Sequence, residues 1–201
     1  KGSASLYVGA PNVPEFDVCE LESATIQTYL EKIEEAAASG YDVLVIDSWS
    51  HSWMQTQETV TQLGGWTKAG KSISPLTTKL TNALLSYPGH VIATFRSKAE
   101  YALEKDEKGK TGMRKIGLAP VARPETEFDF TVWLEMDRDG SVTVSKSRCG
   151  NSLPVGEIYS RNVDIPKIGK ALRAWLEQGA PVSPADDIAE RMRFAQTVKA
   201  L

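Results

Sequence analysis

The chain has 201 residues, of which 41% are hydrophobic and 24% charged, and its formal net charge is −3 at pH 7. This length allows one sizeable core with an appendage, and no apolar run approaches the ~20 residues of a membrane span. The charge excludes a globally basic nucleic-acid-binding surface, so such contact would need a local basic patch. Two widely spaced cysteines, Cys19 and Cys149, favour free thiols in a reducing compartment.

The amino-terminal part predicts two strands followed by a helix. The strands are expected at Ser5 to Val8 and Phe16 to Leu21, because both stretches are apolar and a proline-containing turn separates them. The helix is expected to be capped by Ser23 and to end at Gly40. Its apolar side chains recur with helical spacing at Ile26, Tyr29, Leu30, Ile33, Ala36 and Ala37.

The next stretch has the form of a Walker B element. Four apolar residues, Val43 to Ile46, lead directly into Asp47 and Ser48. A strand without polar alternation is expected to be buried on both faces, as in a parallel sheet, and ligands bind at the carboxyl ends of such strands. In a P-loop NTPase, the acid at this place helps to hold Mg²⁺ through water.

After Ser48 the composition becomes polar and glycine-rich up to Gly70, which predicts a long irregular and functional segment. Ser74-Pro75 predicts a helix start, and Pro88-Gly89 predicts its end. A second apolar strand, Val91 to Phe95, then leads into Arg96. Alternating strands and helices predict a parallel sheet.

One segment matches the P-loop expression G-x-x-x-x-G-K-[ST] letter for letter. It reads Gly65-Trp66-Thr67-Lys68-Ala69-Gly70-Lys71-Ser72. A P-loop must follow a buried strand and open a helix, so that backbone N–H groups cradle the phosphates. The preceding residues, Thr56 to Leu63, do not have a strand pattern, and we interpret the match as accidental.

The carboxyl-terminal part predicts a charged loop, a hairpin and a helical tail. The loop is Glu104 to Lys115, and the hairpin pairs Glu127 to Met136 with Ser141 to Lys146 across an Asp137-to-Gly140 turn. Helices are expected around Ile168 to Leu176 and from about Pro184. The predicted fold is therefore α/β, with a mainly parallel central sheet, a β-hairpin near the carboxyl-terminal side and a helical tail.

Five separate sequence segments, in this order along the chain, resemble segments of the phage-encoded RecA-like AAA ATPases of single-strand annealing and recombination. They are Lys1 to Tyr7, Val45 to Trp53, His90 to Lys98, Arg114 to Val121 and Ser145 to Cys149. The resemblance covers about residues 1–150. It implies a RecA-like ATPase core at 1–160, a helical tail at 161–201, and a cytoplasmic location in a bacterial host cell. It also implies that the family's P-loop and its water-polarising acid lie upstream of Lys1, so we expect the chain to begin inside a longer gene product.

The resemblance implies roles for particular residues. Asp47 corresponds to the Mg²⁺-organising acid, with Ser48 as a neighbouring group that helps to bind ATP. Thr94 and Arg96 correspond to a sensor of the γ-phosphate. Lys146 and Arg148 are expected to alternate on one strand face and to reach the nucleotide of a neighbouring subunit, as an arginine finger does. His51 either lines the same site or is a structural hydrogen-bonding residue.

The resemblance also assigns single-stranded DNA to the loops after the two apolar strands. The expected DNA contacts combine tryptophans for base stacking with cations for phosphates. In the first loop they are Trp66, Lys68 and Lys71, with Trp53 nearby; in the second they are Lys98, Lys108, Lys110, Arg114 and Lys115. The mixed charge of the second loop is equally typical of a solvated loop, and the tryptophans could pack on the core.

The sequence thus predicts an ATP- and Mg²⁺-dependent ATPase that assembles as a homo-oligomer on single-stranded DNA, without a membrane partner. One alternative is a non-catalytic DNA-binding or protein-interaction module with the same fold. Another is an unrelated NTPase in which Gly65 to Ser72 is a genuine P-loop.

Overall fold

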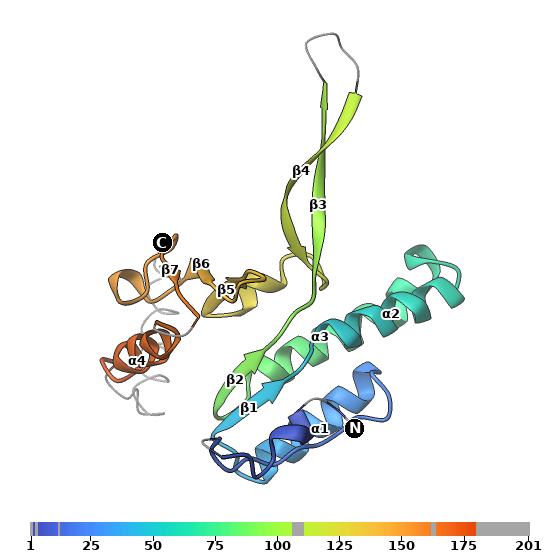
Figure 1. Cartoon of the computed structure of the whole chain (residues 1–201). Coiled ribbons are helices and arrows are strands. Elements are labelled where there is room, and N and C mark those ends of the chain that lie inside the picture. The colour runs from blue at the N-terminus through green and yellow to red at the C-terminus, as the bar shows by residue number, and fades with distance from the viewer. Residues whose placement is uncertain (1, 3, 12, 106–110, 162–163, 180–201) are drawn as a thin grey trace, which may run out of the picture. The chain divides into compact units, whose positions relative to one another are not determined.

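The computed structural model describes residues 2, 4–11, 13–105, 111–161 and 164–179. The fold is mixed α/β and divides into two compact units, Lys1–Asp129 and Phe130–Leu201 (Figure 1). The boundary expected at residue 160 lies inside the second unit. None of the helices in the described part of the chain has the length and hydropathy that a membrane crossing requires.

The amino-terminal strands are not present. Residues Ala4–Tyr7 form a 3-10 helix (η1), and Phe16 to Leu21 belongs to no sheet. The apolar side chains that suggested strands stay at the surface: Leu6, Tyr7 and Val8 are all exposed. Without a neighbouring strand to pair with, an apolar stretch of this length has no ladder to join, and the two strand predictions are wrong.

The first helix confirms its apolar pattern. Helix α1 spans Ile26–Ala38 and buries Ile26, Tyr29, Leu30 and Ile33, and Gly40 follows its end with φ of 76°. Its cap is Thr25 and not Ser23, because the Thr25 hydroxyl accepts a hydrogen bond of 3.2 Å from the Thr28 N–H.

Strands β1 (Val43–Ile46) and β2 (His90–Ala93) pair in parallel, from Val43 opposite His90 to Ile46 opposite Ala93. This confirms the two predicted parallel strands. Burial on both faces is not observed, since the exposed fractions of Val43, Val45 and Ile92 are 48%, 60% and 54%. In the described residues this sheet has only these two strands, and one of its faces stays open.

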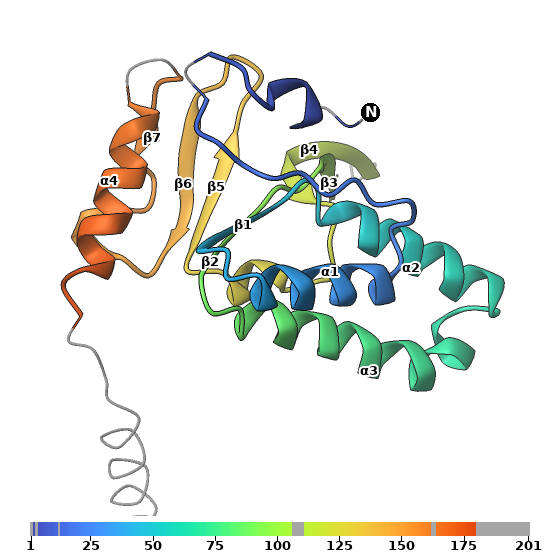
Figure 2. The same ribbon diagram turned by 90° about the horizontal axis from the view of Figure 1, so that it is seen from below.

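The segment expected to be irregular is a helical hairpin. Helix α2 spans Ser50–Gln62 and helix α3 spans Trp66–Leu85, with Gly64 and Gly65 at φ of 85° and 92° in the turn. The predicted helix start at Ser74-Pro75 is therefore wrong, because Pro75 is exposed inside α3 and the helix runs through it. Helices α1 and α3 lie side by side (Figure 2).

The predicted charged loop is also largely regular. Strands β3 (Ser97–Lys105) and β4 (Thr111–Pro120) form an antiparallel hairpin, with a register shift between Glu100 and Tyr101. A short 3-10 helix (η2, Thr126–Asp129) follows. The described sheets are thus one parallel pair and two antiparallel sheets, so the expectation of a mainly parallel central sheet is wrong.

The second unit contains strands β5 (Val132–Met136), β6 (Val142–Ser147) and β7 (Ile158–Tyr159), the 3-10 helix η3 (Gly150–Ser152) and helix α4 (Ile165–Leu176). The hairpin between β5 and β6 confirms the predicted turn, with Gly140 at φ of 84°. Its first strand begins later than expected, because residues up to Asp129 belong to η2. The helix expected from Pro184 lies outside the described residues. The core consists of Val142, Val144, Cys149, Leu153, Tyr159 and Ile168.

Candidate functional site

Asp47 and Thr94 meet at the carboxyl ends of β1 and β2. The Thr94 hydroxyl donates a hydrogen bond of 2.6 Å to Asp47 Oδ1. The parallel ladder continues past the strands, because the Thr94 N–H donates to the Ile46 carbonyl and the Trp49 N–H donates to the Thr94 carbonyl, both at 3.0 Å. The peptide bond between Asp47 and Ser48 is cis. These hydrogen bonds place an exposed carboxylate at the sheet edge where parallel sheets bind ligands.

The turn behind Asp47 is anchored to helix α1. The Tyr29 hydroxyl donates a hydrogen bond of 2.8 Å to the Ser48 carbonyl, and its ring packs edge-on against Trp49 with 6.0 Å between centroids. Burial, followed by the negative charge of Asp47, raises the pKa of Tyr29 above its ordinary value. The phenol therefore stays protonated as the donor, and the turn is fixed while Asp47 is left accessible.

The residues after the two strands are also tied together. The Arg96 N–H donates a hydrogen bond of 2.9 Å to the hydroxyl of Ser50, whose side chain is fully buried. The Ser48 hydroxyl and His51 Nδ1 lie 3.1 Å apart in a hydrogen bond. His51 thus has the structural contact that was one of its two expected roles. Arg96 is exposed beside this network.

Tyr29 and Ser50 were not among the predicted site residues. Tyr29 lies in the apolar stripe of α1, where its spacing indicates a core residue and not a hydrogen-bond donor to a turn. Ser50 lies in a helix that has no apolar stripe. Only its position three residues after Asp47 connects it to the site in the sequence.

Lys146 and Arg148 belong to the second unit. Lys146 lies on β6 opposite Trp133, and its ammonium donates to the Phe130 carbonyl. Arg148 follows the end of β6, and its N–H donates a hydrogen bond of 3.0 Å to the Thr131 carbonyl. The half-buried Lys146 side chain thus lies near the carboxyl end of β6. The exposed Arg148 side chain lies one residue beyond that end.

The predicted DNA contacts lie on three elements. Trp66, Lys68 and Lys71 are exposed on the first turns of α3, and Lys98 is exposed near the start of β3. The backbone of Arg114 and Lys115 belongs to β4, whereas Lys108 and Lys110 lie outside the described residues. The Trp66 ring stacks on Trp53 with 5.9 Å between centroids and 26° between planes. The two expected DNA-binding loops are therefore a helical hairpin and a β-hairpin.

The segment Gly65 to Ser72 is the start of helix α3 and follows helix α2, not a strand. The N–H groups of Lys68 and Ala69 donate to the Gly65 carbonyl at 3.1 and 3.0 Å. Donors that are used within a helix cannot wrap around phosphates, as those of a P-loop do. This geometry agrees with an accidental motif and disfavours an NTPase that uses these residues as its cradle.

Protein ligands alone do not make a metal centre in the described part of the chain. No group of three or more His, Cys, Asp or Glu side chains there lies close enough to hold a metal ion. Mg²⁺ usually takes one or two carboxylates together with phosphate oxygens and water. Asp47 offers one exposed carboxylate of the kind that such a shared site uses, whereas the Ser48 hydroxyl is buried and bonded to His51 Nδ1.

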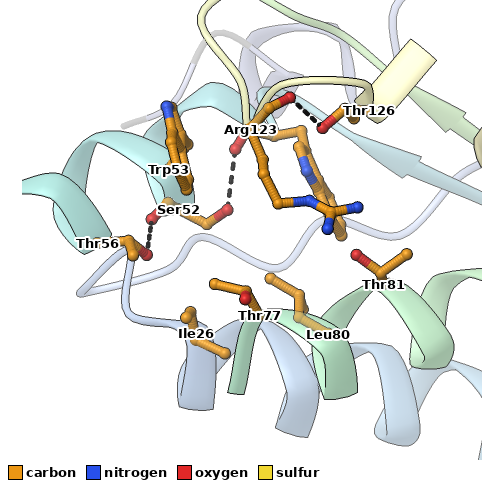
Figure 3. A pocket seen from close by; sticks show the side chains of 10 residues that line it. Ile26, Ser52, Trp53, Thr56, Thr77, Leu80, Thr81, Arg123 and Thr126 are labelled. Atoms are coloured by element: carbon orange, nitrogen blue, oxygen red, sulfur yellow. Dashed lines mark hydrogen bonds between the residues drawn. The ribbon is translucent and has the colours of Figure 1, made fainter. Parts of the chain in front are cut away.

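The first unit contains a pocket lined by residues of α1, α2 and α3 and an open groove lined by residues of α2 and α3. The pocket has a volume of about 30 Å³, which is room for one or two water molecules. Figure 3 shows the Arg123 side chain extending toward α3, where Thr77, Leu80 and Thr81 form part of the lining. The groove has a volume of about 400 Å³ and is lined by Trp53, Gln57, Trp66, Ser74, Thr77, Thr78, Arg123 and Pro124.

No protein-family model matches this chain, and neither a curated protein nor a solved structure matches it significantly. Two features of the first unit indicate what the protein can bind. They are the carboxylate at the end of the parallel strands and the aromatic groove between α2 and α3.

Proposed function

We propose that the chain carries the metal-organising acid and the sensor of a RecA-like ATPase, which couples Mg-ATP to assembly on single-stranded DNA in phage recombination or single-strand annealing. The observation that carries the proposal is the 2.6 Å hydrogen bond from Thr94 to Asp47. It joins the ends of two parallel strands at the edge where α/β proteins bind nucleotides. The five sequence segments that resemble this family support the same assignment.

The proposal gives Asp47 and Ser48 the role of organising Mg²⁺, which would neutralise charge on the β- and γ-phosphates. Thr94 orients the acid through its hydroxyl, and Arg96 follows on a backbone that Ser50 holds in place. A sensor needs this connection, because a change at the nucleotide must reach the chain that leaves the strand. Here that chain is the β3–β4 hairpin, which begins at Ser97.

Gly65–Ser72 is not the phosphate cradle in this proposal, because these residues form the start of helix α3. In this proposal the described residues do not supply the cradle. Lys146 and Arg148 act on the nucleotide of a neighbouring subunit in a homo-oligomer. The catalytic step would then need both the neighbouring subunit and a phosphate cradle outside the described residues.

A second candidate is a non-catalytic DNA-binding or protein-interaction module. The observation that favours it is the open apolar face of the β1–β2 pair, where Val43, Val45 and Ile92 are exposed. Exposed apolar side chains that gather on one face are typical of interaction surfaces. This candidate predicts DNA or protein binding without nucleotide turnover.

ATP hydrolysis by the full-length gene product, measured with and without single-stranded DNA, tests between the two. The proposal predicts hydrolysis that DNA stimulates, and a Thr94→Val variant that binds ATP but turns it over more slowly. DNA or protein binding with no ATP hydrolysis, whether or not DNA is present, would support the non-catalytic module instead.

A further inference from the structure

The groove between α2 and α3 has an aromatic end that is built and accessible. Trp53 of α2 and Trp66 at the start of α3 stack at 5.9 Å, so each ring fixes the plane of the other. Trp66 is 41% exposed despite this contact. A pre-oriented indole with free surface can extend its stack with a further planar ring, at little conformational cost.

The α3 side of the groove is lined by small polar side chains. Ser74, Thr77 and Thr78 lie 8, 11 and 12 residues after Trp66, which places them on one side of α3. The hydroxyls of Thr77 and Thr78 donate to the Ser74 carbonyl at 2.8 and 3.0 Å, so both side chains fold back on the helix. Gly70, between Trp66 and Ser74, has open space within 4 Å of the position of a Cβ atom.

The lining of the groove also includes a cationic side chain. Arg123 lines the groove, and none of the groove-lining residues is an Asp or a Glu. Its Nη2 donates to Asp129 Oδ2 at 3.3 Å, in a pair whose side chains are 42% and 24% exposed. A guanidinium has five N–H donors, so this contact leaves others for an anion, and its planar fork suits a phosphate.

We propose that this groove binds a nucleotide, with the base stacked on Trp66 and a phosphate held by Arg123. An aromatic end and a cationic wall around a volume of about 400 Å³ match a ligand that is planar at one end and anionic at the other. A proline-rich peptide would use the tryptophans and leave the cation unused. A nucleotide within single-stranded DNA is the source that follows from the proposed function, on which this part of the inference rests.

Lys68 and Lys71, which were expected to contact DNA, do not line the groove. The Lys68 side chain extends along the α2–α3 turn. Its Nζ lies 3.2 Å from the point where a Cβ atom would stand if Gly64 were replaced by a larger residue. These lysines can add general attraction for a strand outside the groove. The inference assigns the base-stacking contact to Trp66 and the localised phosphate contact to Arg123.

The test is binding of a fluorescein-labelled oligothymidylate, followed by anisotropy and by quenching of tryptophan fluorescence, without ATP. Trp66→Ala is expected to weaken binding about tenfold or more, because it removes a stacked base, while Trp66→Phe retains most of the affinity. Arg123→Ala is expected to weaken binding and to reduce the slope of log K against log salt by about one. Tyr7→Ala and Arg138→Ala replace exposed residues that do not line the groove and should leave binding unchanged.

Thymidine monophosphate and a proline-rich peptide form two further arms. Quenching by the oligonucleotide alone supports a site for a nucleotide within a strand, and equal quenching by the monophosphate supports a site for free nucleotides. Unchanged oligonucleotide affinity in both Trp66→Ala and Arg123→Ala overturns the inference, as does quenching by the peptide alone. Because no ATP is present, failure of the proposed ATPase activity does not affect these readings.

Discussion

Thr94 and Asp47 are 47 residues apart in the chain, and the Thr94 hydroxyl donates a hydrogen bond of 2.6 Å to the Asp47 carboxylate. The parallel register of β1 and β2 brings the two residues together, since Ile46 lies opposite Ala93 and each strand is followed by one of them. The contact orients an exposed acid without burying it. An acid held in this way stays accessible to a cation that also binds phosphate oxygens.

The anchoring of this turn by Tyr29 predicts a stability effect. Tyr29→Phe removes the donor to the Ser48 carbonyl and leaves a buried acceptor without this partner, which costs about 1–3 kcal/mol. Urea denaturation of the 201-residue chain measures the change in the free energy of unfolding. Tyr41→Phe is the matched control, because the Tyr41 hydroxyl bonds to Asp17 at the surface and its loss should cost much less. Equal losses in both variants would contradict the anchoring role.

The raised pKa of Tyr29 predicts a loss of stability in alkali. Because the pKa is higher in the folded than in the unfolded chain, the folded state binds more protons between the two values. The stabilising contribution is complete below the unfolded pKa near 10 and is lost as pH rises through the folded value. Unfolding measured from pH 8 to 11 should show a steeper alkaline decline for the wild type than for Tyr29→Phe. Parallel curves would show that this titration has no part in the decline.

The motif at Gly65 to Ser72 predicts the absence of an effect. Lys71 lies inside helix α3 and is exposed, so Lys71→Ala in the full-length gene product should leave ATP affinity within about threefold, or ~0.7 kcal/mol. Equilibrium binding of a fluorescent ATP analogue measures this affinity. A hundredfold loss would place the phosphate cradle at this segment after all.

The proposed action of Lys146 and Arg148 on a neighbouring subunit predicts complementation. Lys146→Ala/Arg148→Ala subunits should bind ATP but lose DNA-stimulated hydrolysis, and Asp47→Asn subunits should lose hydrolysis for a different reason. Mixing the two should restore some activity, because some interfaces then combine an intact acid with intact cations. Absence of rescue over a range of mixing ratios would show that the two cations act only within their own subunit.

Much of the site could be predicted because it depends on strong local patterns. The apolar stripe of α1 and the apolar runs of β1 and β2 identify these elements, and parallel pairing then implies that Asp47 and Thr94 are neighbours. Burial could not be predicted from the run Val43 to Ile46. It depends on which elements cover the sheet, and in the described residues one face remains open.

The helical hairpin could not be recognised because α2 buries polar residues. Ser52 and Thr56 are buried, and their hydroxyls donate to the carbonyls of Trp49 and Ser52 at 3.0 and 2.7 Å. Such local hydrogen bonds satisfy the hydroxyls inside a helix but remove the apolar stripe from the sequence. The aromatic groove was missed for the same reason, since it needs α2 and α3 to bring Trp53 and Trp66 together.

The proposed role of Asp47 in organising the metal at a nucleotide is tested most directly by ATP turnover of the full-length Asp47→Asn variant. Loss of this carboxylate should reduce turnover at least ~10²-fold while the fold is preserved, because the main effect of the metal is to stabilise charge in the transition state. Asp42→Asn is the matched control, since Asp42 is an exposed acid at the amino end of the same strand. Reduced turnover in Asp47→Asn with normal turnover in Asp42→Asn is the predicted result, and unchanged turnover in Asp47→Asn would contradict the account.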